Sequence, residues 1–319
     1  MAQRDHNPFP FSEDNKRYLT YSCYLKRRFG GKVFKVPLDL GLGCPNRDGS
    51  KGAGGCIFCS ERRSGDFAGD PCEDIAAQYA GVGGMMRKKW PEGRCIAYFQ
   101  AGSNTYADTS LLKAVFERAA GFEGCVGVSV ATRADCIDSE KADMLAGLSE
   151  KTYLTVELGL QSIYDKTAAL CNRCHTFAEF LDGYSLLRER GINICVHIIN
   201  GLPGESREMM LETAARVGEL RPHAVKIHLL HILKNTRLAE MYEKGEFRAM
   251  EKDEYISLVC DQIERMPQDV IIERVTGDGA RDQLIAPLWS LKKFEVMNGI
   301  DKELYRRDSW QGISAPAAI

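Results

Sequence analysis

Short, nearly continuous apolar runs alternate with segments of helical periodicity along most of the chain. The expected strands are Val33–Leu40, Cys95–Gln100, Val126–Ala131, Tyr153–Leu160, Ile192–Asn200 and Val225–His231. The expected helices lie between them, at Asp74–Lys89, Ser110–Ala120, Ser139–Leu148, Phe177–Arg190 and Arg207–Leu220. Strands that are apolar on both faces suit a parallel sheet covered by helices, and most successive strands start about thirty residues apart, the length of one βα unit. The pattern therefore predicts an α/β fold, a partial (β/α)6 barrel of the TIM type.

The alternation weakens after Leu233. Helical patterns cover Asp253–Met266 and most of Leu284–Arg307, and Val270–Val275 is expected to be an edge strand. We find no repeat, linker or low-complexity segment, so we expect one domain over residues 1–319. Its parts are a basic N-terminal extension (1–31), a barrel core (32–233) with a cysteine loop (41–60), and a C-terminal extension (234–319). Both extensions are expected to pack on the barrel.

Polar or glycine-rich residues follow every expected strand. They are Gly41–Cys44, Gln100–Thr105, Thr132–Arg133, Gly159–Ser162, Asn200–Glu205, and His228 with His231. In parallel barrels the chemistry sits at the carboxyl ends of the strands. The six motifs are therefore expected to form one site.

Composition narrows the class of protein. Apolar residues make up 44% and charged residues 27% of the chain, and the net charge is −2. No apolar run approaches the ~18 residues that a membrane span needs, and Met1–Phe11 lacks a signal-peptide pattern. We therefore expect a cytoplasmic protein with no membrane partner. Its twelve cysteines are then expected to be reduced thiols, some of them metal ligands.

Three of these cysteines, Cys44, Cys56 and Cys59, lie in one glycine-rich loop. The glycines let the backbone wrap closely around a bulky group, and Cys-x-x-Cys spacing brings two sulfurs to one metal site. With three thiolates and no local fourth, a [4Fe–4S] cluster would keep one iron open for a small molecule. A zinc site shared with Cys171 and Cys174 is an alternative reading. A redox dithiol at Cys56 and Cys59 is another, although it leaves Cys44 unexplained.

This loop, with an aromatic residue (Phe58) before its last cysteine, resembles the radical S-adenosylmethionine (SAM) superfamily. Eleven residues separate Cys44 from Cys56, where the usual spacing is three. The longer spacing resembles the branch of the Elongator catalytic subunit, without its acetyltransferase domain. Segments Cys44–Gly49, His197–Glu205 and Ala286–Trp289 resemble one bacterial family of that branch. The resemblance implies a [4Fe–4S] cluster whose open iron binds SAM, and reductive cleavage of SAM to a 5′-deoxyadenosyl radical that removes hydrogen from a substrate.

The resemblance also implies positions that contact SAM. They are Phe58, Gln100, Gly102, Ser103, Asn104, Thr132, Glu157, Gln161, Arg173, His197, Gly201 and Pro203. The motif at Gln100, Gly102 and Ser103 would receive the amino group. Glu157 and Gln161 would lie near the ribose hydroxyls. Arg173 would grip the carboxylate through its planar fork.

Two further groups concern the substrate. His228 and His231 would face opposite sides of a regular strand, and we assign His228 to substrate contact as the catalytic candidate. The stretch Lys16–Lys35 is basic, lacks acidic residues and is interleaved with aromatic rings. Its candidate RNA-binding residues are Lys16, Arg17, Lys26, Arg27 and Arg28. The alternative for this stretch is a solvated helix face followed by an edge strand.

The related bacterial family is associated with tRNA wobble-uridine modification. The resemblance thus implies loss of the carboxymethyl group from carboxymethylaminomethyl-uridine, which leaves aminomethyl-uridine. The implied partners are tRNA, a reductant such as flavodoxin or ferredoxin, and a downstream tRNA methyltransferase. Two alternatives remain at this point: a radical SAM enzyme acting on a small metabolite or porphyrin-like substrate, and a non-enzymatic iron–sulfur or zinc protein used for binding or sensing.

Overall fold

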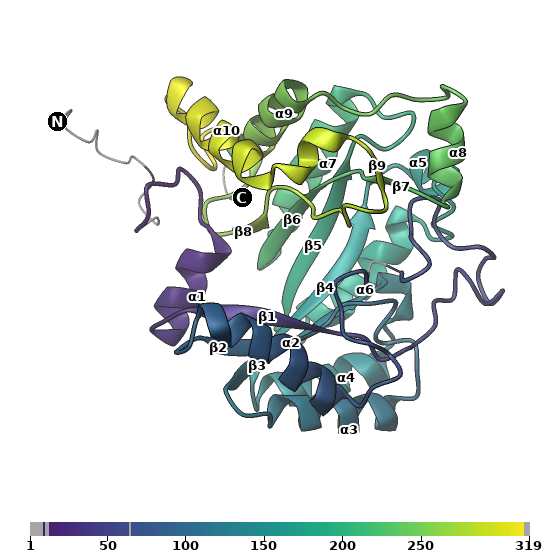
Figure 1. Ribbon diagram of the computed structural model, residues 1–319, viewed down its shortest axis with the longest axis vertical. Coiled ribbons are helices and arrows are strands. Elements are labelled where there is room, and N and C mark those ends of the chain that lie inside the picture. The colour runs from purple at the N-terminus through teal and green to yellow at the C-terminus, as the bar shows by residue number, and fades with distance from the viewer. Residues whose placement is uncertain (1–8, 10–12, 64, 316–319) are drawn as a thin grey trace.

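The computed structural model describes residues 9, 13–63 and 65–315. Residues 1–8 and 10–12 of the expected N-terminal extension lie outside the described residues. A curved sheet of seven strands dominates the fold (Figure 1), in the order β1-β2-β3-β4-β5-β6-β8, and every neighbouring pair is parallel. The strands are β1 (Val33–Leu38), β2 (Arg94–Phe99), β3 (Cys125–Thr132), β4 (Tyr153–Gln161), β5 (Asn193–Asn200), β6 (Ala224–Leu229) and β8 (Ile271–Arg274).

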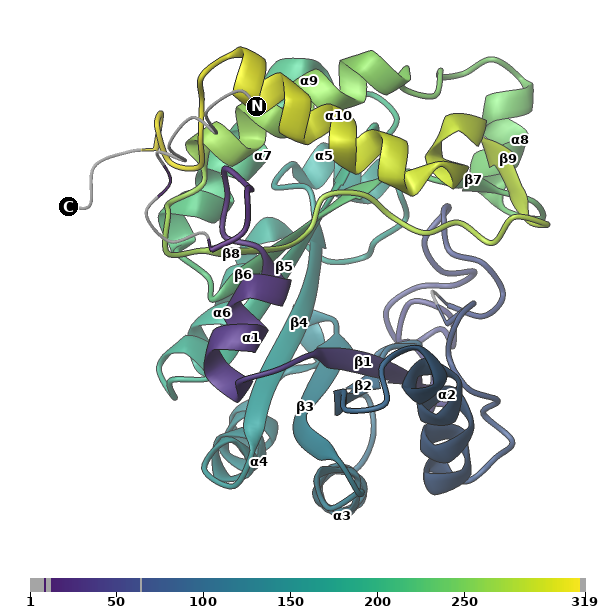
Figure 2. The ribbon, with the colours of Figure 1, turned by 60° about the vertical axis from the view of Figure 1, so that its left-hand side comes forward.

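Helices cover the outer face of this sheet in Figures 1 and 2. They are α2 (Ile75–Lys89), α3 (Thr109–Ala120), α4 (Ser139–Ser149), α6 (Phe177–Arg188) and α7 (Arg207–Leu220). Each begins directly after a side chain that accepts hydrogen bonds from the exposed backbone N–H groups of the first turn. These caps are Asp74, Asp108, Asp138, Thr176 and Ser206. The predicted α/β partial barrel is therefore confirmed, and the expected edge strand Val270–Val275 is present as β8 at the edge of the sheet.

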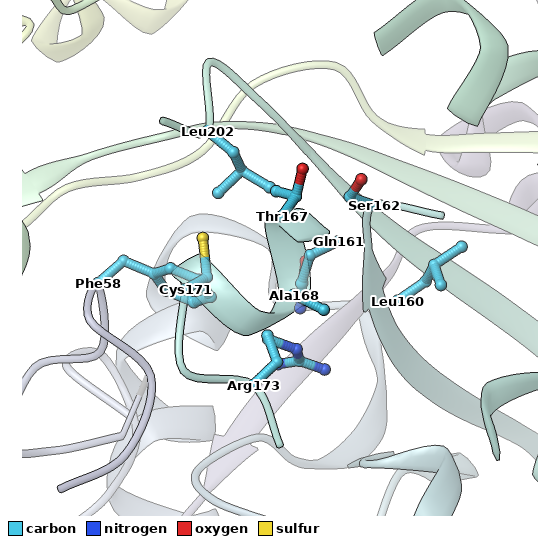
Figure 3. Close-up of a pocket in the computed structure, with 9 residues that line it drawn as sticks. All are labelled: Phe58, Leu160, Gln161, Ser162, Thr167, Ala168, Cys171, Arg173 and Leu202. Carbon is cyan, nitrogen blue, oxygen red and sulfur yellow. The ribbon is translucent and has the colours of Figure 1, made fainter. Parts of the chain in front are cut away.

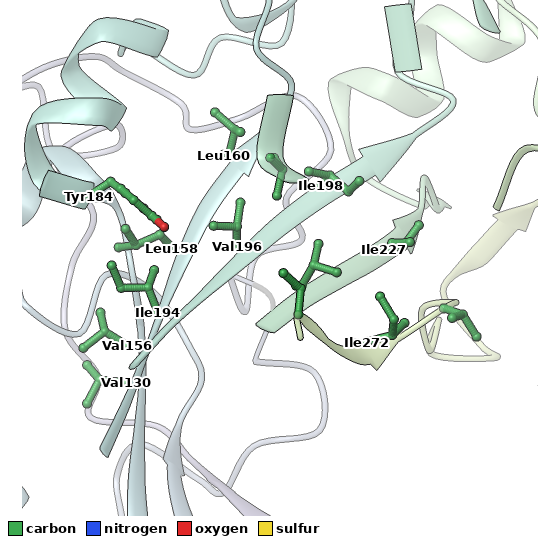
Figure 4. Close-up of a cluster of buried hydrophobic side chains, with 14 of the residues drawn as sticks. Val130, Val156, Leu158, Leu160, Tyr184, Ile194, Val196, Ile198, Ile227 and Ile272 are labelled. Atoms are coloured by element: carbon green, nitrogen blue, oxygen red, sulfur yellow. The ribbon is translucent and has the colours of Figure 1, made fainter. Parts of the chain in front are cut away.

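The core lies between the sheet and these helices. Alternate residues of each strand point outward into it, as Val156, Leu158 and Leu160 of β4 do (Figure 4). The residues between them point to the inside of the barrel, as Glu157 does. This period of two lets one strand serve a dry core on one face and a polar site on the other.

The N-terminal segment packs against the barrel at the amino ends of its strands. Helix α1 (Tyr21–Phe29) packs against both β1 and β8, the two open edges of the sheet. Its Leu25 clusters with Val33 and Tyr153 at the amino ends of β1 and β4. Thr20 forms an isolated parallel bridge with Ile272 of β8. The barrel is therefore open only at the carboxyl ends of its strands.

The C-terminal extension adds α8 (Arg237–Glu243), α9 (Lys252–Arg265) and α10 (Lys293–Arg306). Helix α9 packs against α7 and α10. The predicted helix over Leu284–Arg307 is correct only for its second half, because Leu284–Ala286 forms β9, antiparallel to β7 (Ile232–Leu233), and Leu288–Leu291 forms the 3-10 helix η2. The remaining short elements are η1 (Ala134–Cys136) and α5 (Asp165–Leu170). Among the described residues, no helix combines the length and apolar character that membrane crossing requires.

Candidate active site

The cysteine loop connects β1 to α2 at the open end of the barrel. Between Cys44 and Cys56 the chain makes a small hairpin, in which Asp48 bridges Ala53 and the Gly49 N–H donates to the Gly52 carbonyl. This hairpin accounts for the long spacing between the first two cysteines. At Gly52 an added Cβ would overlap Asn46 and would lie 2.6 Å from the Cys174 sulfur. The loop therefore needs a glycine at this position.

The Cys56 sulfur lies in a setting that favours a thiolate. Asn46 Nδ2 lies 3.5 Å and Arg173 Nη1 3.7 Å from it, within hydrogen-bonding distance. The hydrogen bond from Cys59, and after it the charges of Arg173 and Arg133, hold the pKa of Cys56 well below its ordinary value, although burial opposes this. Thiolates are the ligands of iron–sulfur clusters. The surroundings of Cys56 therefore fit a thiolate ligand, and cluster binding by Cys44, Cys56 and Cys59 stays a prediction.

The residues around the loop fit a cluster in further respects. Arg173 Nε, Arg133 Nη1 and Asn46 Oδ1 are buried and have no hydrogen-bond partner among the described residues, and such orphaned groups ordinarily have a partner. Beside Cys56 and Cys59 lies a hollow of about 310 Å³, lined also by the loop glycines and Asn172. The donor set and the room therefore suit a bulky anionic group.

The zinc alternative has less support from the geometry. Within the described ranges, no three His, Cys, Asp or Glu side chains converge on one metal-ion position. A structural zinc ion needs four ligands at one point, whereas a four-iron cluster distributes its thiolates over separate corners. Cys171 is buried, and Cys174 packs against Gly52 of the loop. Both contact the loop as packing residues.

Several predicted SAM-contacting residues border one narrow pocket (Figure 3). Its lining includes Phe58, Gln161 and Arg173, three of the predicted positions, together with Cys171 and Leu202. Gln161 has φ +73° and follows an irregularity in the β4–β5 register. Its buried Oε1 has no hydrogen-bond partner among the described residues. An amide oxygen placed in this way is available to a ligand hydroxyl.

Some residues that line this pocket were not among the predicted site residues. Leu202, Ser162 and Thr167 also line the pocket, and Ser162 is hydrogen-bonded to Glu205. Burial raises the pKa of Glu205 above its ordinary value, although Ser162 and Thr167 oppose the shift. Pocket-lining apolar residues carry no motif of their own, but Leu202 and Glu205 lie in the predicted strand-end segment Asn200–Glu205. Gly201 of that segment has φ +88°, and its N–H donates to the Met210 sulfur. Pro203 lies two residues beyond it.

The second strand-end motif is partly used by the scaffold. Asn104 donates to the backbone oxygens of Phe99 and Ala131 at 3.0 and 2.8 Å. The hydroxyls of Thr132 and Thr105 share a hydrogen bond of 2.6 Å. These contacts join the ends of β2 and β3. The Ser103 N–H donates to the Gly43 carbonyl, and Gly102 has φ +77° and follows Gln100 by two residues, so the whole motif lies beside the cysteine loop. Direct contact of its members with SAM stays a prediction.

Glu157 has a setting that the sequence did not predict. Its carboxylate is fully buried inside the barrel. Both of its oxygens are already taken, by Lys35 and Lys226 at 2.5 Å each, by the hydroxyls of Tyr98 and Ser129 at 2.8 and 2.7 Å, and by His197 Nε2 at 2.9 Å. The expected contact of Glu157 with the SAM ribose is therefore not supported, because the carboxylate points into this network. His197 belongs to the same network.

Glu273 of β8 completes a group of four charges. It pairs with Lys35 and lies 3.1 Å from Lys226. We call Lys35, Glu157, Lys226 and Glu273 the central charge cluster. Burial alone would lower the pKa of Lys35, but Glu157 and Glu273 raise it well above the ordinary value. Burial alone would raise the pKa of Glu157, but Lys226 and Lys35 lower it well below. The two lysines pair with the two carboxylates, so the formal charges of the cluster balance.

The regular strand that the prediction for His228 and His231 assumed ends between the two residues. Strand β6 ends at Leu229, so no alternation relates their side chains. The His228 ring centroid is 5.1 Å from that of His197. His231 lies against the turn after β8, because a Cβ added to Gly277 would come within 2.8 Å of its Cε1. A role of His228 in substrate contact stays a prediction.

The basic N-terminal residues lie away from the cysteine loop. Lys26, Arg27 and Arg28 form the last turn of α1, before the amino end of β1, whereas the loop follows the carboxyl end of β1. Arg27 pairs with Glu13 at 2.8 Å, and Arg28 lies over the Tyr153 ring.

The first two residues of the predicted RNA-binding set are also paired. Lys16 contacts Asp301, and Arg17 lies 3.0 Å from Asp308. Much of the basic charge of this stretch is thus used within the protein, and a role in RNA binding stays a prediction.

Sequence comparison identifies relatives of this chain. A family profile described as the Radical SAM superfamily matches residues 40–217, and one described as the Radical_SAM C-terminal domain matches residues 222–306. The chain is 49% identical over 307 residues to YtqA of Bacillus subtilis, described as uncharacterized, with 96% of this chain and 95% of YtqA covered. A tRNA uridine(34) acetyltransferase of Methanocaldococcus infernus is 30% identical over 157 residues, which are 48% of this chain and 29% of that protein.

Solved structures share the fold. The archaeal Elp3 of Methanocaldococcus infernus superposes with a TM-score of 0.65 at 18% identity, covering 88% of this chain and 64% of that one. Methylornithine synthase (PylB) superposes with a TM-score of 0.50 at 12% identity, covering 91% and 86% of the two chains.

Proposed function

Because the chain belongs to the radical SAM superfamily, we propose that it acts on a modified wobble uridine of tRNA, converting carboxymethylaminomethyl-uridine to aminomethyl-uridine. The enzymes of this superfamily use a [4Fe–4S] cluster and SAM. When bound, these groups supply a 5′-deoxyadenosyl radical that removes a hydrogen atom from the substrate. The observation that carries the cluster part of the proposal is the Cys56 sulfur, hydrogen-bonded by Asn46 and Arg173 at the open end of the barrel, whereas the choice of substrate rests on the similarity to tRNA uridine(34) acetyltransferases.

The residues of this chain have distinct tasks in the proposal. Cys44, Cys56 and Cys59 would hold the cluster, and Arg173 would stabilise thiolate charge while its second terminal nitrogen is held by the Gly159 carbonyl at 2.5 Å. Phe58 would line the narrow pocket that it shares with Gln161 and Arg173, on the side of the cysteine loop. Such a pocket excludes water and prevents side reactions of a radical.

The choice of tRNA is supported by relatives on the sequence level. The match to tRNA uridine(34) acetyltransferases covers about half of this chain. Their name states an action on uridine 34 of tRNA, which is the wobble position. Elongator complex protein 3 of Mus musculus matches over a similar length at 28% identity. The shared part lies within a radical SAM chain, so we infer that the shared substrate class is the wobble uridine. A downstream tRNA methyltransferase would then act on the amine product.

A small electron-transfer protein such as flavodoxin or ferredoxin is the proposed reductant. The hollow beside Cys56 and Cys59 is lined by Arg47 and Arg237, which suits an acidic partner. We further propose that residues 1–319 form one domain, since β8 of the C-terminal extension belongs to the barrel sheet.

The proposal is tested with anaerobically purified protein reconstituted with iron and sulfide. After reduction with dithionite, SAM is added and 5′-deoxyadenosine is followed by mass spectrometry, with Cys56→Ala as the control. The substrate is tRNA from cells that lack the enzyme, and its nucleosides are analysed for aminomethyl-uridine. Formation of both products by the wild type alone supports the proposal. 5′-Deoxyadenosine without any change in the tRNA nucleosides would refute the substrate and favour a small-molecule substrate.

A further inference from the structure

The β6–β8 side of the barrel mouth carries cationic and neutral donors that the proposed chemistry leaves unused. His228 is the last residue but one of β6, His231 lies two residues beyond the end of that strand, and Arg274 ends β8, the neighbouring strand. The turn after β8 lies against His231, since a Cβ added to Gly277 would come within 2.8 Å of His231 Cε1. Three nitrogen-bearing side chains therefore lie at or just beyond the carboxyl ends of two neighbouring strands.

An irregularity in β8 determines where Arg274 points. Val225 pairs with Ile272 and Lys226 pairs with Arg274, so Glu273 is an extra residue on the β8 side. A bulge of this kind re-aims the side chains that flank it. Glu273 reaches Lys226 inside the barrel. Arg274 pairs with Lys226 in the β6–β8 register, so the two residues point to the same face, and His228 lies two residues beyond Lys226 on that face of β6. Two consecutive residues thus serve the same interior.

Both imidazoles have an unused nitrogen. His228 Nε2 and His231 Nε2 are buried and have no hydrogen-bond partner among the described residues. Buried polar atoms are nearly always paired, so these two nitrogens point to a missing hydrogen-bond partner, which is an acceptor when Nε2 carries the proton. Burial, then neighbouring positive groups including Arg274, hold the pKa of His228 well below its ordinary value. Burial likewise lowers the pKa of His231 to about 4. Neutral imidazoles present one N–H donor each.

The charges around these donors leave an excess of positive charge. The central charge cluster is balanced. Outside it, Arg274 and Lys293 share the single carboxylate of Asp278, with distances of 3.6 Å from Arg274 and 2.9 Å from Lys293. Arg274 is therefore only loosely paired, and a second carboxylate would satisfy it with the bidentate geometry that guanidinium groups favour.

We propose that His228, His231 and Arg274 form a subsite that binds a carboxylate of the substrate. The inference rests on the proposed function in one respect, because the carboxymethyl group of the modified uridine would supply that carboxylate. The subsite would hold this group in place for the reaction. A substrate that lacks the carboxylate, as the aminomethyl product does, would leave Arg274 with only its loose pairing to Asp278 and would bind more weakly.

The test compares two anticodon stem–loop RNAs that differ only at the wobble base, which carries either carboxymethylaminomethyl-uridine or aminomethyl-uridine. Binding to the reconstituted protein is measured by fluorescence anisotropy for the wild type, Arg274→Gln and Arg274→Lys. Arg118→Gln is the matched control, since Arg118 also pairs with an aspartate but lies on α3. Loss of a charge-assisted pair should weaken binding of the carboxylate RNA about tenfold to a hundredfold. Arg274→Lys should lose less, and binding of the aminomethyl RNA should not change.

A second readout does not need RNA. Protein labelled with ¹³C in its six histidines is titrated with the free nucleoside carboxymethylaminomethyl-uridine, and the His228 and His231 signals are assigned with the His228→Gln and His231→Gln variants. These two signals should move with the carboxylate nucleoside, and not with aminomethyl-uridine or in Arg274→Gln.

Each outcome decides the matter. Equal weakening of both RNAs by Arg274→Gln would mean a phosphate contact and would overturn the subsite. Unchanged binding of both RNAs, with histidine signals that do not move, would also overturn it. Histidine shifts that depend on Arg274, in a protein that neither binds nor converts either RNA, would retain the carboxylate subsite and refute the tRNA proposal.

Discussion

Replacing Glu157 by Gln should destabilise the protein strongly, because it unbalances the central charge cluster. The change keeps the shape of the side chain but leaves Lys35 and Lys226 with only Glu273 as counter-charge. Two unit charges 4 Å apart interact by about 4 kcal/mol at the effective dielectric of a protein. Removing one partner of a buried pair typically costs about 3–5 kcal/mol. At about 2–4 °C per kcal/mol for domains somewhat shorter than this chain, Tm should fall by roughly 6–20 °C.

A second substitution separates charge balance from lost packing. Lys226→Met in the Glu157→Gln background restores one lysine to one carboxylate, Lys35 to Glu273. The double variant should therefore be more stable than the sum of the two single effects, by about 1–3 kcal/mol. Urea unfolding of the reconstituted protein under anaerobic conditions measures all four members of this cycle. Effects that add within about 0.5 kcal/mol would refute the reasoning.

The pH dependence gives the same cluster an independent check. The folded-state pKa of Glu157 is depressed, so its stabilisation is complete above the unfolded value of about 4.3 and is lost as pH falls through the folded value. The folded-state pKa of Lys35 is raised, so its stabilisation is complete below about 10.4 and is lost as pH rises further. The Tm gap between wild type and Glu157→Gln should be constant between about pH 5 and 10 and should shrink in acid. A gap that widens in acid would contradict this assignment.

Three further predictions concern packing and the cysteine loop. Gly183→Ala should lower the free energy of unfolding by about 1–3 kcal/mol or more, because a Cβ on α6 would overlap the Ala134 backbone. The control is Gly147→Ala, in an open stretch of α4, which should be neutral or slightly stabilising. Thermal melts compare the two variants. Cys56→Ala should abolish 5′-deoxyadenosine formation and lower the amount of bound iron. Cys174→Ala should keep both the product and the iron, as product and iron assays measure. Equal losses in the two variants would favour a larger set of metal ligands. Arg173→Leu should make the reduction potential of the cluster more negative, because a cation and hydrogen bond near the Cys56 sulfur are lost; an unchanged potential in an EPR titration would remove Arg173 from this role.

The barrel and the position of its site followed from local patterns in the sequence. Apolar runs of strand length and helical periodicity are local properties, and the motif after each strand is fixed by chain direction alone. Asn46 and Arg173 are separated by most of the barrel in sequence, yet both reach the Cys56 sulfur. Such contacts require the curvature of the sheet, which no local window contains.

The interior charges show the same limit more clearly. Glu157 and Lys226 read as polar interruptions of apolar strands, and Lys35 reads as part of a basic surface stretch. Only the folded sheet brings them together, since Lys35 of β1 and Lys226 of β6 both reach the Glu157 carboxylate of β4. The bulge that aims Arg274 inward depends on the pairing of β6 with β8, and the sequence marks β8 as no more than an edge strand. Of the residues in the proposed subsite, His228 was therefore predictable from its place at a strand end, whereas Arg274 was not.

The central charge cluster also answers a mechanical problem of an open barrel. The sheet ends at β1 on one side and at β8 on the other, so no backbone ladder fixes the distance between these edges. The ion pair of Lys35 with Glu273 joins β1 to β8 across the interior, and Glu157 binds side chains from β1, β2, β3, β5 and β6 at once. A charge-assisted hydrogen bond needs a short donor–acceptor distance and specific donor geometry, unlike an apolar contact that tolerates sliding. The cluster therefore constrains the spacing between the two sides of the mouth, with the cysteine loop after β1 and the proposed Arg274 subsite at the end of β8.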